Sequence, residues 1–306
     1  MKIGIISLGG KSSLSIAEAC KKYFREVDSL NIRNFEVHLT PEGINLTYGG
    51  KSLKDYDCLY IRGSHKYALL QRAITRVLSR KVYNPIDKEG FALGHDKFLT
   101  LVELQKQKIA IPSTYYAATT ELAKQILEKE VKYPVIMKVP RGTHGKGVMV
   151  ADSLASGKSI LDLLEHFKEP YLIQEFVKTK SVSDIRAIVV GSKVVAAYER
   201  RAGNGELRAN IHLGGERHKY TLSSDEEKLA VGSAKAIGAD ICGVDILNSK
   251  SPSVIEINLS PGIAAIEEVT GVDVSDTIAE FLHSQTLKFK EKKKRKADKK
   301  FNKIIE

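Results

Sequence analysis

The chain has 306 residues, about twice the usual length of one domain, so two or three packed units are expected. Hydrophobic residues make up 42% and charged residues 28%, the balance of a soluble globular protein, which excludes wholesale disorder and a collagen-like repeat. Lys and Arg number 48 against 37 Asp and Glu. The net charge of +11 indicates an anionic partner, such as a nucleotide, a nucleic acid, an acidic protein or a membrane surface.

The three cysteines, Cys20, Cys58 and Cys242, lie far apart and form neither a metal-binding spacing nor a disulfide framework. This usage favours a reducing compartment. The opening sequence MKIGIISLGG has the pattern of a strand and a turn, without the regions of a signal peptide. No apolar run approaches the roughly 20 residues that span a bilayer. We therefore expect a soluble, cytoplasmic chain.

Strands and helices alternate at the start of the chain. An apolar strand is expected at residues 2–8, followed by a glycine turn and by apolar residues at helical spacing over 14–20. A second strand is expected at 58–62, after a polar turn, and a helix at 67–78. This alternation predicts a small parallel sheet flanked by helices over roughly the first 90 residues.

The remaining elements include two antiparallel strand pairs. Asp96 is expected at the N-terminus of a helix over 96–106. Further elements are predicted in this order: strand 113–117, helix 121–130, strand 134–139, helix 161–166 and strand 171–176. The two pairs follow, with a helix at 224–237 between them: strands 184–190 and 193–199, then strands 241–247 and 253–258.

The last 19 residues, 288–306, are highly charged and low in complexity, which predicts a solvated tail or a frayed helix. They hold ten Lys or Arg against three Asp or Glu, whereas the preceding residues hold 38 against 34. Most of the excess positive charge therefore belongs to this segment and lies outside the body of the protein.

A glycine-rich loop follows the apolar strand that ends near Val139. Gly142, Gly145 and Gly147 allow the backbone to approach a ligand and to turn its N–H groups toward a polyphosphate. Lys138, Arg141 and Lys146 add positive charge. The loop is not a Walker A motif, because no GKS or GKT opens a helix. A plain hairpin turn is the alternative interpretation.

Three oxygen-bearing side chains mark the second antiparallel pair. Asp245 ends the run ICGVD, and Glu256 and Asn258 are two residues apart in the next strand, so both point to one face. If the two strands are neighbours, these oxygens converge as ligands suited to Mg²⁺. The alternative is the solvated face of an alternating strand.

Arginines are frequent in the glycine-containing segment RRAGNGELRAN, which we interpret as a loop. Arg200, Arg201 and Arg208, with Asn210, are candidates for binding a carboxylate or a phosphoryl group in transfer. A solvated surface is the alternative interpretation. Asp184 and Arg186, two apart on one strand, are candidates for an ordinary cross-strand charge pair.

In their order along the chain, these motifs resemble the ATP-grasp superfamily and, within it, the RimK-like amino-acid ligases. The resemblance extends from residue 1 to about residue 285 and rests on the following sequences: GHDK (94–97), VIMKVPRGTHGKGV (135–148), IQEFV (173–177), SDIRAIVVG (183–191), ERRA (199–202), LRANIHLGG (207–215), GVDIL (243–247) and EINLSPGIAAIEEVTG (256–271). At two positions the chain departs from the family's usual loop, which has glutamine in place of His144 and an apolar residue in place of Lys146.

The resemblance implies an α+β (α/β) ATP-grasp fold in which two α+β subdomains hold ATP. The expected units are a Rossmann-like domain over 1–94, a central subdomain with the phosphate loop over 95–170, a C-terminal subdomain with the metal site over 171–287, and the basic tail over 288–306.

The resemblance also implies nucleotide contacts. Lys97 and Lys138 would hold the α- and β-phosphates of ATP, and Asp184 would reach the ribose. The residues implied to cover the nucleotide with their loop are Gly142, Thr143, Gly145 and Gly147. The residues whose backbone would read the adenine edge are Glu175, Phe176 and Val177.

At the reacting end, Arg208 and Asn210 would face the phosphates and an acyl phosphate. The ligands of two Mg²⁺ (or Mn²⁺) ions would be Asp245, Glu256 and Asn258, with Glu256 bridging. The chemistry would be ATP-dependent joining of a carboxylate and an amine, through an acyl phosphate and with release of ADP.

As a member of this family, the chain is expected to add L-glutamate, or a similar amino acid, to a carboxylate of an acceptor. The expected acceptor is a protein C-terminus or a coenzyme. The alternatives are a ligase acting on the amino-group carrier protein of lysine and arginine biosynthesis, and a non-catalytic module that binds nucleotide or RNA. A homo-oligomer, dimer or tetramer, is expected, and the basic tail is a candidate contact for the ribosome, RNA or an acidic protein.

Overall fold

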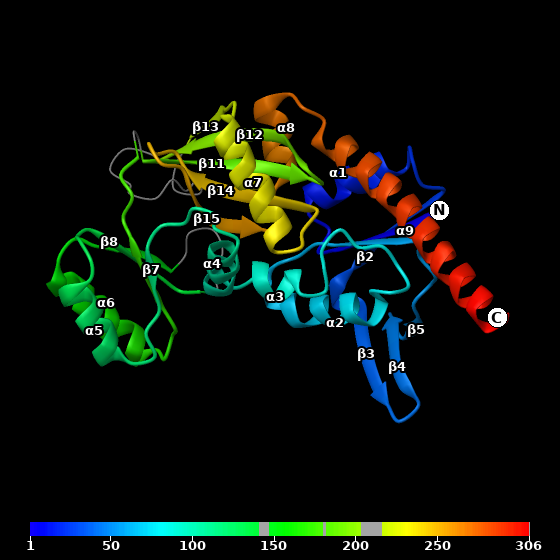
Figure 1. Cartoon of the computed structure of the whole chain (residues 1–306), viewed down its shortest axis with the longest axis horizontal. Coiled ribbons are helices and arrows are strands. Elements are labelled where there is room, and N and C mark those ends of the chain that lie inside the picture. The colour runs from blue at the N-terminus through cyan, green and yellow to red at the C-terminus, as the bar shows by residue number, and fades with distance from the viewer. Residues whose placement is uncertain (141–146, 180–181, 203–215, 306) are drawn as a thin grey trace.

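The computed structural model describes residues 1–140, 147–179, 182–202 and 216–305, with side chains through residue 298 (Figure 1). Its first strand, β1 (Lys2–Ser7), lies at the centre of a parallel sheet in the order β2-β1-β6. The flanking strands are β2 (Glu26–Asn31) and β6 (Cys58–Ile61). Ile3, Ile5 and Ile6 are buried, as expected for a central parallel strand that is covered on both faces. This sheet confirms the expected parallel layer.

Helices and one small sheet complete the N-terminal region. The helices are α1 (Lys11–Cys20), α2 (Ala68–Leu78) and α3 (Gly90–Gly94), with 3-10 turns at Ile32–Asn34 and His65–Tyr67. The antiparallel strands β3 (Phe35–Thr40), β4 (Gly43–Tyr48) and β5 (Lys51–Ser52) form a hairpin sheet that projects from the body (Figure 1). The sequence analysis did not predict this hairpin sheet or β2.

The central subdomain has its own hydrophobic core. Its sheet has the order β7-β10-β8-β9, with strands β7 (Thr114–Tyr115), β8 (Val135–Lys138), β9 (Val148–Ala151) and β10 (Leu172–Glu175). Helices α5 (Thr120–Lys129) and α6 (Leu154–His166) pack together on this sheet, and Leu127, Met137, Leu161 and Ile173 are buried between the layers. The expected strand–loop–strand arrangement around the glycine-rich loop is confirmed by the antiparallel pairing of β8 and β9.

The C-terminal subdomain is built on an antiparallel sheet in the order β13-β12-β11-β14-β15. Its strands are β11 (Ser183–Val190), β12 (Lys193–Arg201), β13 (Glu216–Lys219), β14 (Ile241–Leu247) and β15 (Ser253–Asn258). Both predicted strand pairs are present as hairpin partners. The sheet also contains β13, which the sequence analysis did not predict.

Helices cover both faces of this five-stranded sheet. On one face, α7 (Ser224–Ala236) packs with Ala187, Val189 and Val244. On the other face, α8 (Ile263–Thr270) packs with Ile188 and Tyr198. Helix α4 (Lys97–Lys106) contacts β15 at the end of the sheet nearest the central subdomain. The site residues of β11, β12, β14 and β15 are thus carried by a sheet that is packed on both faces.

The last helix, α9 (Val274–Ile305), begins in the core and has left it by residue 290. Val274, Ile278, Ala279 and Leu282 are buried, and the helix packs along α1. From residue 290 to residue 298 every side chain is exposed. The basic segment is therefore the continuation of a packed helix, without a break at residue 288. No helix in the described part of the chain has the length and apolarity needed to cross a membrane.

Candidate active site

A single glycine closes the predicted phosphate loop. Gly147 has φ of 78°, and a Cβ added there would lie 2.5 Å from Cγ2 of Val139. Its carbonyl accepts a hydrogen bond of 3.1 Å from the N–H of Val139, which extends the β8–β9 ladder. Only glycine both adopts this left-handed backbone without strain and lacks the Cβ that would collide with Val139. The other predicted residues of the loop, Gly142, Thr143 and Gly145, lie outside the described residues.

Lys138 lies at the end of β8, and its Nζ donates to Oε1 of Gln174 on the adjacent strand β10 at 2.7 Å. The lysine is only 6% exposed. The pKa of Lys138 is lowered to about 8, mainly by burial; Glu256 opposes this change and the charge of Lys97 contributes to it. A buried ammonium that has no ion pair with a described carboxylate is suited to binding a phosphate.

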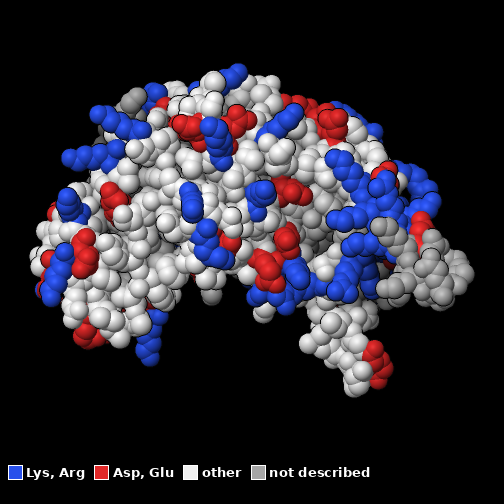
Figure 2. Space-filling view, viewed as in Figure 1, with Lys and Arg blue, Asp and Glu red and all other residues white. Residues whose placement is uncertain are grey.

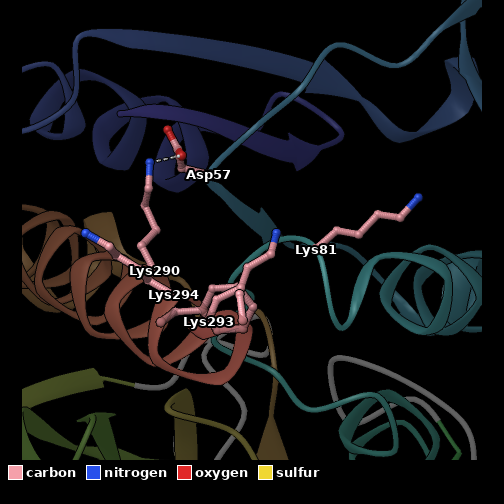
Figure 3. A pocket seen from close by; sticks show the side chains of 7 residues that line it. Asp57, Lys81, Lys290, Lys293 and Lys294 are labelled. Atoms are coloured by element: carbon pink, nitrogen blue, oxygen red, sulfur yellow. Dashed lines mark hydrogen bonds and ion pairs between the residues drawn. The ribbon is translucent and has the colours of Figure 1, made fainter. Parts of the chain in front are cut away.

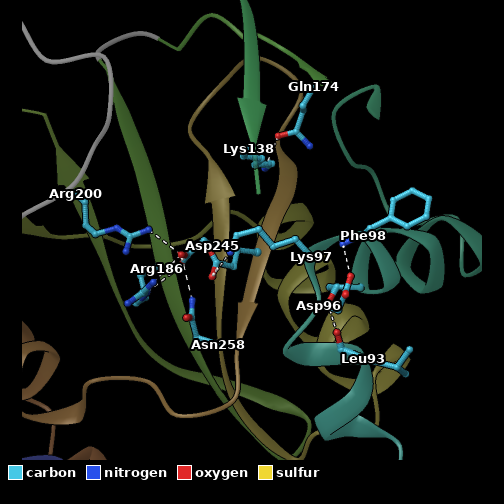
Figure 4. Close-up of polar contacts among 12 residues, drawn as sticks. Leu93, Asp96, Lys97, Phe98, Lys138, Gln174, Arg186, Arg200, Asp245 and Asn258 are labelled. Carbon is cyan, nitrogen blue, oxygen red and sulfur yellow. Dashed lines mark hydrogen bonds and ion pairs between the residues drawn. The ribbon is translucent and has the colours of Figure 1, made fainter. Parts of the chain in front are cut away.

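Lys97 is placed by the start of α4. Asp96 caps this helix by accepting hydrogen bonds from the N–H groups of Phe98 and Leu99, both at 3.1 Å, as the sequence predicted (Figure 4). The next residue, Lys97, reaches Glu256 across to β15, with 3.8 Å between Nζ and Oε1. Two lysines from different elements, α4 and β8, are thus gathered near one carboxylate.

Asp245 is the most strongly held side chain of the site. Its Oδ1 accepts from Nε of Arg186 at 2.7 Å, and its Oδ2 accepts from Nη2 of Arg186 at 2.6 Å. Arg200 Nη2 lies 2.8 Å from Oδ2, and Asn258 Nδ2 lies 3.3 Å from the same oxygen (Figure 4). Burial alone would raise the pKa of Asp245, but the two guanidinium groups more than offset it and hold the pKa well below its usual range.

The three predicted metal ligands are brought together. In the β14–β15 ladder, Asp245 is opposite Glu256 and Gly243 is opposite Asn258, so the condition that the two strands are neighbours is met. Two carboxylates and an amide are hard oxygen donors that fit Mg²⁺. Asp245 and Asn258 are in contact, and Glu256 remains about one-third exposed. When bound, the metal would neutralise charge on the phosphates.

Arg200 and Arg201 are in strand β12, so their predicted place in a loop is wrong. The pairing of Arg200 with Arg217 and of Arg201 with Glu216 on β13 extends the strand past the predicted end. Since consecutive strand residues point to opposite faces, Arg200 reaches Asp245 whereas Arg201 pairs with Glu199, with Nε donating to Oε2 at 2.8 Å. Arg208 and Asn210 lie outside the described residues.

Asp184 and Arg186 each form a cross-strand charge pair, and each does so with a different neighbouring strand of β11. Asp184 accepts a hydrogen bond from Nε of Arg200, and Arg186 contacts Asp245. Burial raises the pKa of Asp184; the charge of Arg200 opposes this change, and the negative charge of Asp245 adds to it. The four side chains form a chain of alternating charge across β12, β11 and β14. The predicted contact of Asp184 with ribose stays a prediction.

The predicted adenine-reading segment begins at the last residue of β10. The N–H of Glu175 donates to the carbonyl of Ser113 at 2.9 Å, and its carboxylate accepts from the N–H of Ser113 at 3.4 Å. Phe176 and Val177 come after the strand has ended. The prediction of adenine contacts therefore rests mainly on the backbone of these last two residues.

Two features of the candidate site were missed from the sequence. Gln174, which is 3% exposed, holds Lys138 and donates through Nε2 to Oγ1 of Thr114 at 2.7 Å. Its position in the apolar strand LIQE, on the same face as Leu172, was an available signal of a buried polar contact. The other feature is the clamp of Arg186 on Asp245, which depends on the register of β11 and β14.

The turn after β15 is fixed by the parallel sheet. Nη2 of Arg62, which is 4% exposed, donates to the carbonyl of Pro261 at 2.8 Å. The N–H of Gly63 donates to Oγ of Ser260, also at 2.8 Å. These contacts link the carboxyl end of β6 to the strand that carries Glu256 and Asn258.

Fold and site together define an ATP-grasp protein: two subdomains face each other, with lysines and a glycine-closed loop on one and carboxylates on the other.

Comparison with known proteins identifies the family. Residues 94–282 match the RimK-like ATP-grasp domain. A relative from Maridesulfovibrio salexigens, named probable alpha-L-glutamate ligase, is 32% identical over 300 residues, which cover 97% of this chain and 100% of the relative. A relative of the same name from Shewanella loihica is 33% identical over 289 residues, which cover 93% of this chain and 96% of the relative. The chain belongs to the RimK-like ATP-grasp family and is an ATP-dependent ligase.

Solved structures have the same fold. The RimK domain ATP-grasp protein from Sphaerobacter thermophilus superposes with a TM-score of 0.70 at 19% identity, covering 92% of this chain and 99% of that one. The ATP-grasp ligase PsnB, solved with Mg, ADP and a precursor variant, gives a TM-score of 0.70 at 16% identity, covering 93% and 98%. A RiPP-associated ATP-grasp ligase from Chryseobacterium gregarium, solved with ADP and a leader and core peptide, gives 0.68 at 19%, covering 93% and 97%.

Proposed function

We propose that this ligase adds L-glutamate to a free carboxylate of an acceptor, either a protein C-terminus or a coenzyme. The observation that carries the proposal is the convergence of Lys97 and Lys138 on the strand pair of Asp245 and Glu256. This arrangement can hold a polyphosphate and its metal next to an acid. The names of the relatives support glutamate as the amine donor.

The proposed reaction has two steps. A carboxylate oxygen of the acceptor attacks the γ-phosphorus of ATP and ADP leaves, which gives an acyl phosphate. The amine of glutamate then attacks the acyl carbon, phosphate leaves, the amine loses a proton and an amide remains. In this reaction the protein positions the reactants and neutralises the charge of the phosphates. The residues proposed to do so are Lys97, Lys138 and the predicted Arg208 and Asn210.

We propose that Asp245, Glu256 and Asn258 hold the Mg²⁺ (or Mn²⁺) ions, two in number, with Glu256 between them. The ion pairs of Asp245 with Arg186 and Arg200 keep its carboxylate ionised and oriented before metal arrives. Metal binding would require no proton release from this group.

The test is the transfer of isotopically labelled glutamate. Purified protein, ATP and Mg²⁺ are incubated with cell extract, and proteins and small molecules are analysed by mass spectrometry. We expect an ATP-dependent label on one acceptor carboxylate, which identifies the acceptor. If ADP is formed with another amino acid but never with glutamate, the proposed donor is wrong. The expected dimer or tetramer is measured on the same preparation by light scattering.

A further inference from the structure

A strongly cationic surface lies at the end of the molecule farthest from the central subdomain. Figure 2 shows Lys and Arg gathered at this end, over the distal part of α9. The exposed cations there are Lys290, Lys292, Lys293, Lys294, Arg295 and Lys296, and the acidic side chains within residues 290–298 are Glu291 and Asp298. The ligase site does not use this surface.

A cavity of about 300 Å³ lies between this part of α9 and the segment that follows α2 (Figure 3). Lysines dominate its lining: Lys81 from the segment after α2, and Lys290, Lys293 and Lys294 from α9. Positions 293 and 294 follow 290 by three and four residues, so all three lie on one face of the helix. This cavity, called the groove below, is therefore formed by two elements of the fold and not by the charged end of α9 alone.

The charge of the groove is not balanced locally. Asp57 is the one carboxylate in the lining, and its Oδ1 is already 2.6 Å from Nζ of Lys290. The ammonium groups of Lys81, Lys293 and Lys294 have no ion pair among the described residues. Three like charges around a concave surface concentrate anions from solution.

The side chains present fit a phosphate backbone better than a protein or a lipid surface. Protein interfaces are centred on aromatic, apolar or arginine anchors and are depleted in lysine. Between residues 290 and 298 the one apolar side chain is Ala297, and Phe289 is partly buried against Tyr83, with 6.3 Å between ring centroids. An amphipathic lipid-binding helix needs an apolar face, which this segment lacks.

We propose that the distal part of α9 and Lys81 form a nucleic-acid-binding surface that holds the phosphodiester backbone without reading its sequence. Phosphates repeat along the strand and need only positive charge at suitable spacing. Because the surface is remote from Asp245 and Lys138, binding there is independent of the proposed transfer of glutamate.

The test is fluorescence anisotropy of a labelled single-stranded RNA oligonucleotide, measured at several salt concentrations. The variant Lys81→Gln/Lys293→Gln/Lys294→Gln removes three charges and keeps the Lys290–Asp57 pair that anchors the helix. The matched control is Lys129→Gln/Lys132→Gln/Lys168→Gln, which removes three exposed lysines of the central subdomain. Circular dichroism checks that both variants are folded.

We expect wild type and control to bind alike, with affinity that falls steeply as salt rises. In the groove variant, the slope of log K against log salt should decrease by about 2, from three lost contacts at roughly 0.7 each. Equal weakening in both variants would mean that only net charge matters, and the proposed surface would be wrong. A polyglutamate peptide that binds more tightly than the oligonucleotide would assign the groove to an acidic protein and also overturn the proposal.

Discussion

Arg186 donates from Nε and Nη2 to the two carboxylate oxygens of Asp245, at 2.7 Å and 2.6 Å, directly across the β11–β14 ladder. Both side chains are removed from water: Asp245 is 3% exposed and Arg186 is 17% exposed. The arrangement fixes the carboxylate's orientation before a metal or a nucleotide binds. A proposed metal ligand is thus held by the fold itself.

Replacing Arg186 by alanine should destabilise the protein, because it leaves Asp245 buried with one guanidinium partner fewer. We expect the free energy of unfolding to fall by about 3–5 kcal/mol, measured by urea denaturation. The control is Arg76→Ala, which removes an arginine that is about half exposed and pairs with the similarly exposed Glu89, and which should change stability by less than about 1 kcal/mol. Similar losses in both variants would contradict the special role of Arg186.

Lys138 gives a pH dependence to nucleotide binding. Its pKa is lowered to about 8, mainly by burial, so the free protein loses this charge as pH rises above 8. The protonated form is the one that attracts phosphate. Affinity for ADP, measured by calorimetry, should therefore be constant below that pH and weaken above it, by up to about tenfold per pH unit.

The matched variant for this prediction is Lys138→Arg, whose guanidinium stays charged throughout the range. Its ADP affinity should show no such decrease between pH 8 and pH 9.5, whatever its absolute value. If wild type and variant weaken in parallel, another group controls the dependence and Lys138 does not contact the phosphates.

Glu256→Gln should abolish formation of ADP while leaving the fold intact, because the side chain keeps its size but loses the charge that faces Lys97 and that would bind the proposed metal. Turnover is followed by ADP release, and folding by thermal unfolding. Glu268→Gln, on the exposed side of α8, is the control and should keep full turnover. Wild-type turnover in the Glu256 variant would rule out its role as a metal ligand.

Gly147→Ala should disturb the phosphate loop for two separable reasons. The left-handed backbone alone should reduce stability by about 1–2 kcal/mol, and the new methyl group would collide with Val139. Adding Val139→Ala should relieve the collision and leave the backbone effect. Chemical denaturation of the single and double variants measures both parts, and a single variant as stable as wild type would contradict the described backbone.

The sequence was most informative where local pattern determines structure. Residues 241–247 and 253–258 were predicted with the bounds that the structure has, because each is a short apolar or alternating run between turns. Strand β2, with the sequence EVDSLN, was missed, since its edge position leaves most of its side chains partly exposed and without a strong apolar pattern.

The side chains that pair across a sheet were harder to predict than the positions of the strands. Asp245, Glu256 and Asn258 were grouped correctly because their motif places them on adjacent strands. The pairing of Arg186 with Asp245 depends on the register of β11 and β14, which are far apart in the sequence, whereas Asp184 and Arg200 face each other across the tight β11–β12 hairpin, beyond the predicted end of β12. Arg200 was assigned to a loop for the same reason, because β13, which extends its strand, is remote in the sequence.

The length of helix α9 determines where its basic side chains lie relative to the body of the protein. Its 32 residues would span about 48 Å as a straight helix, and its first turns are clamped in the core by Val274, Ile278 and Leu282. Each residue added before Lys290 would rotate the lysines by about 100° around the axis. The number of residues between the buried first turns and Lys290 therefore determines the direction in which the basic side chains point away from the body of the ligase.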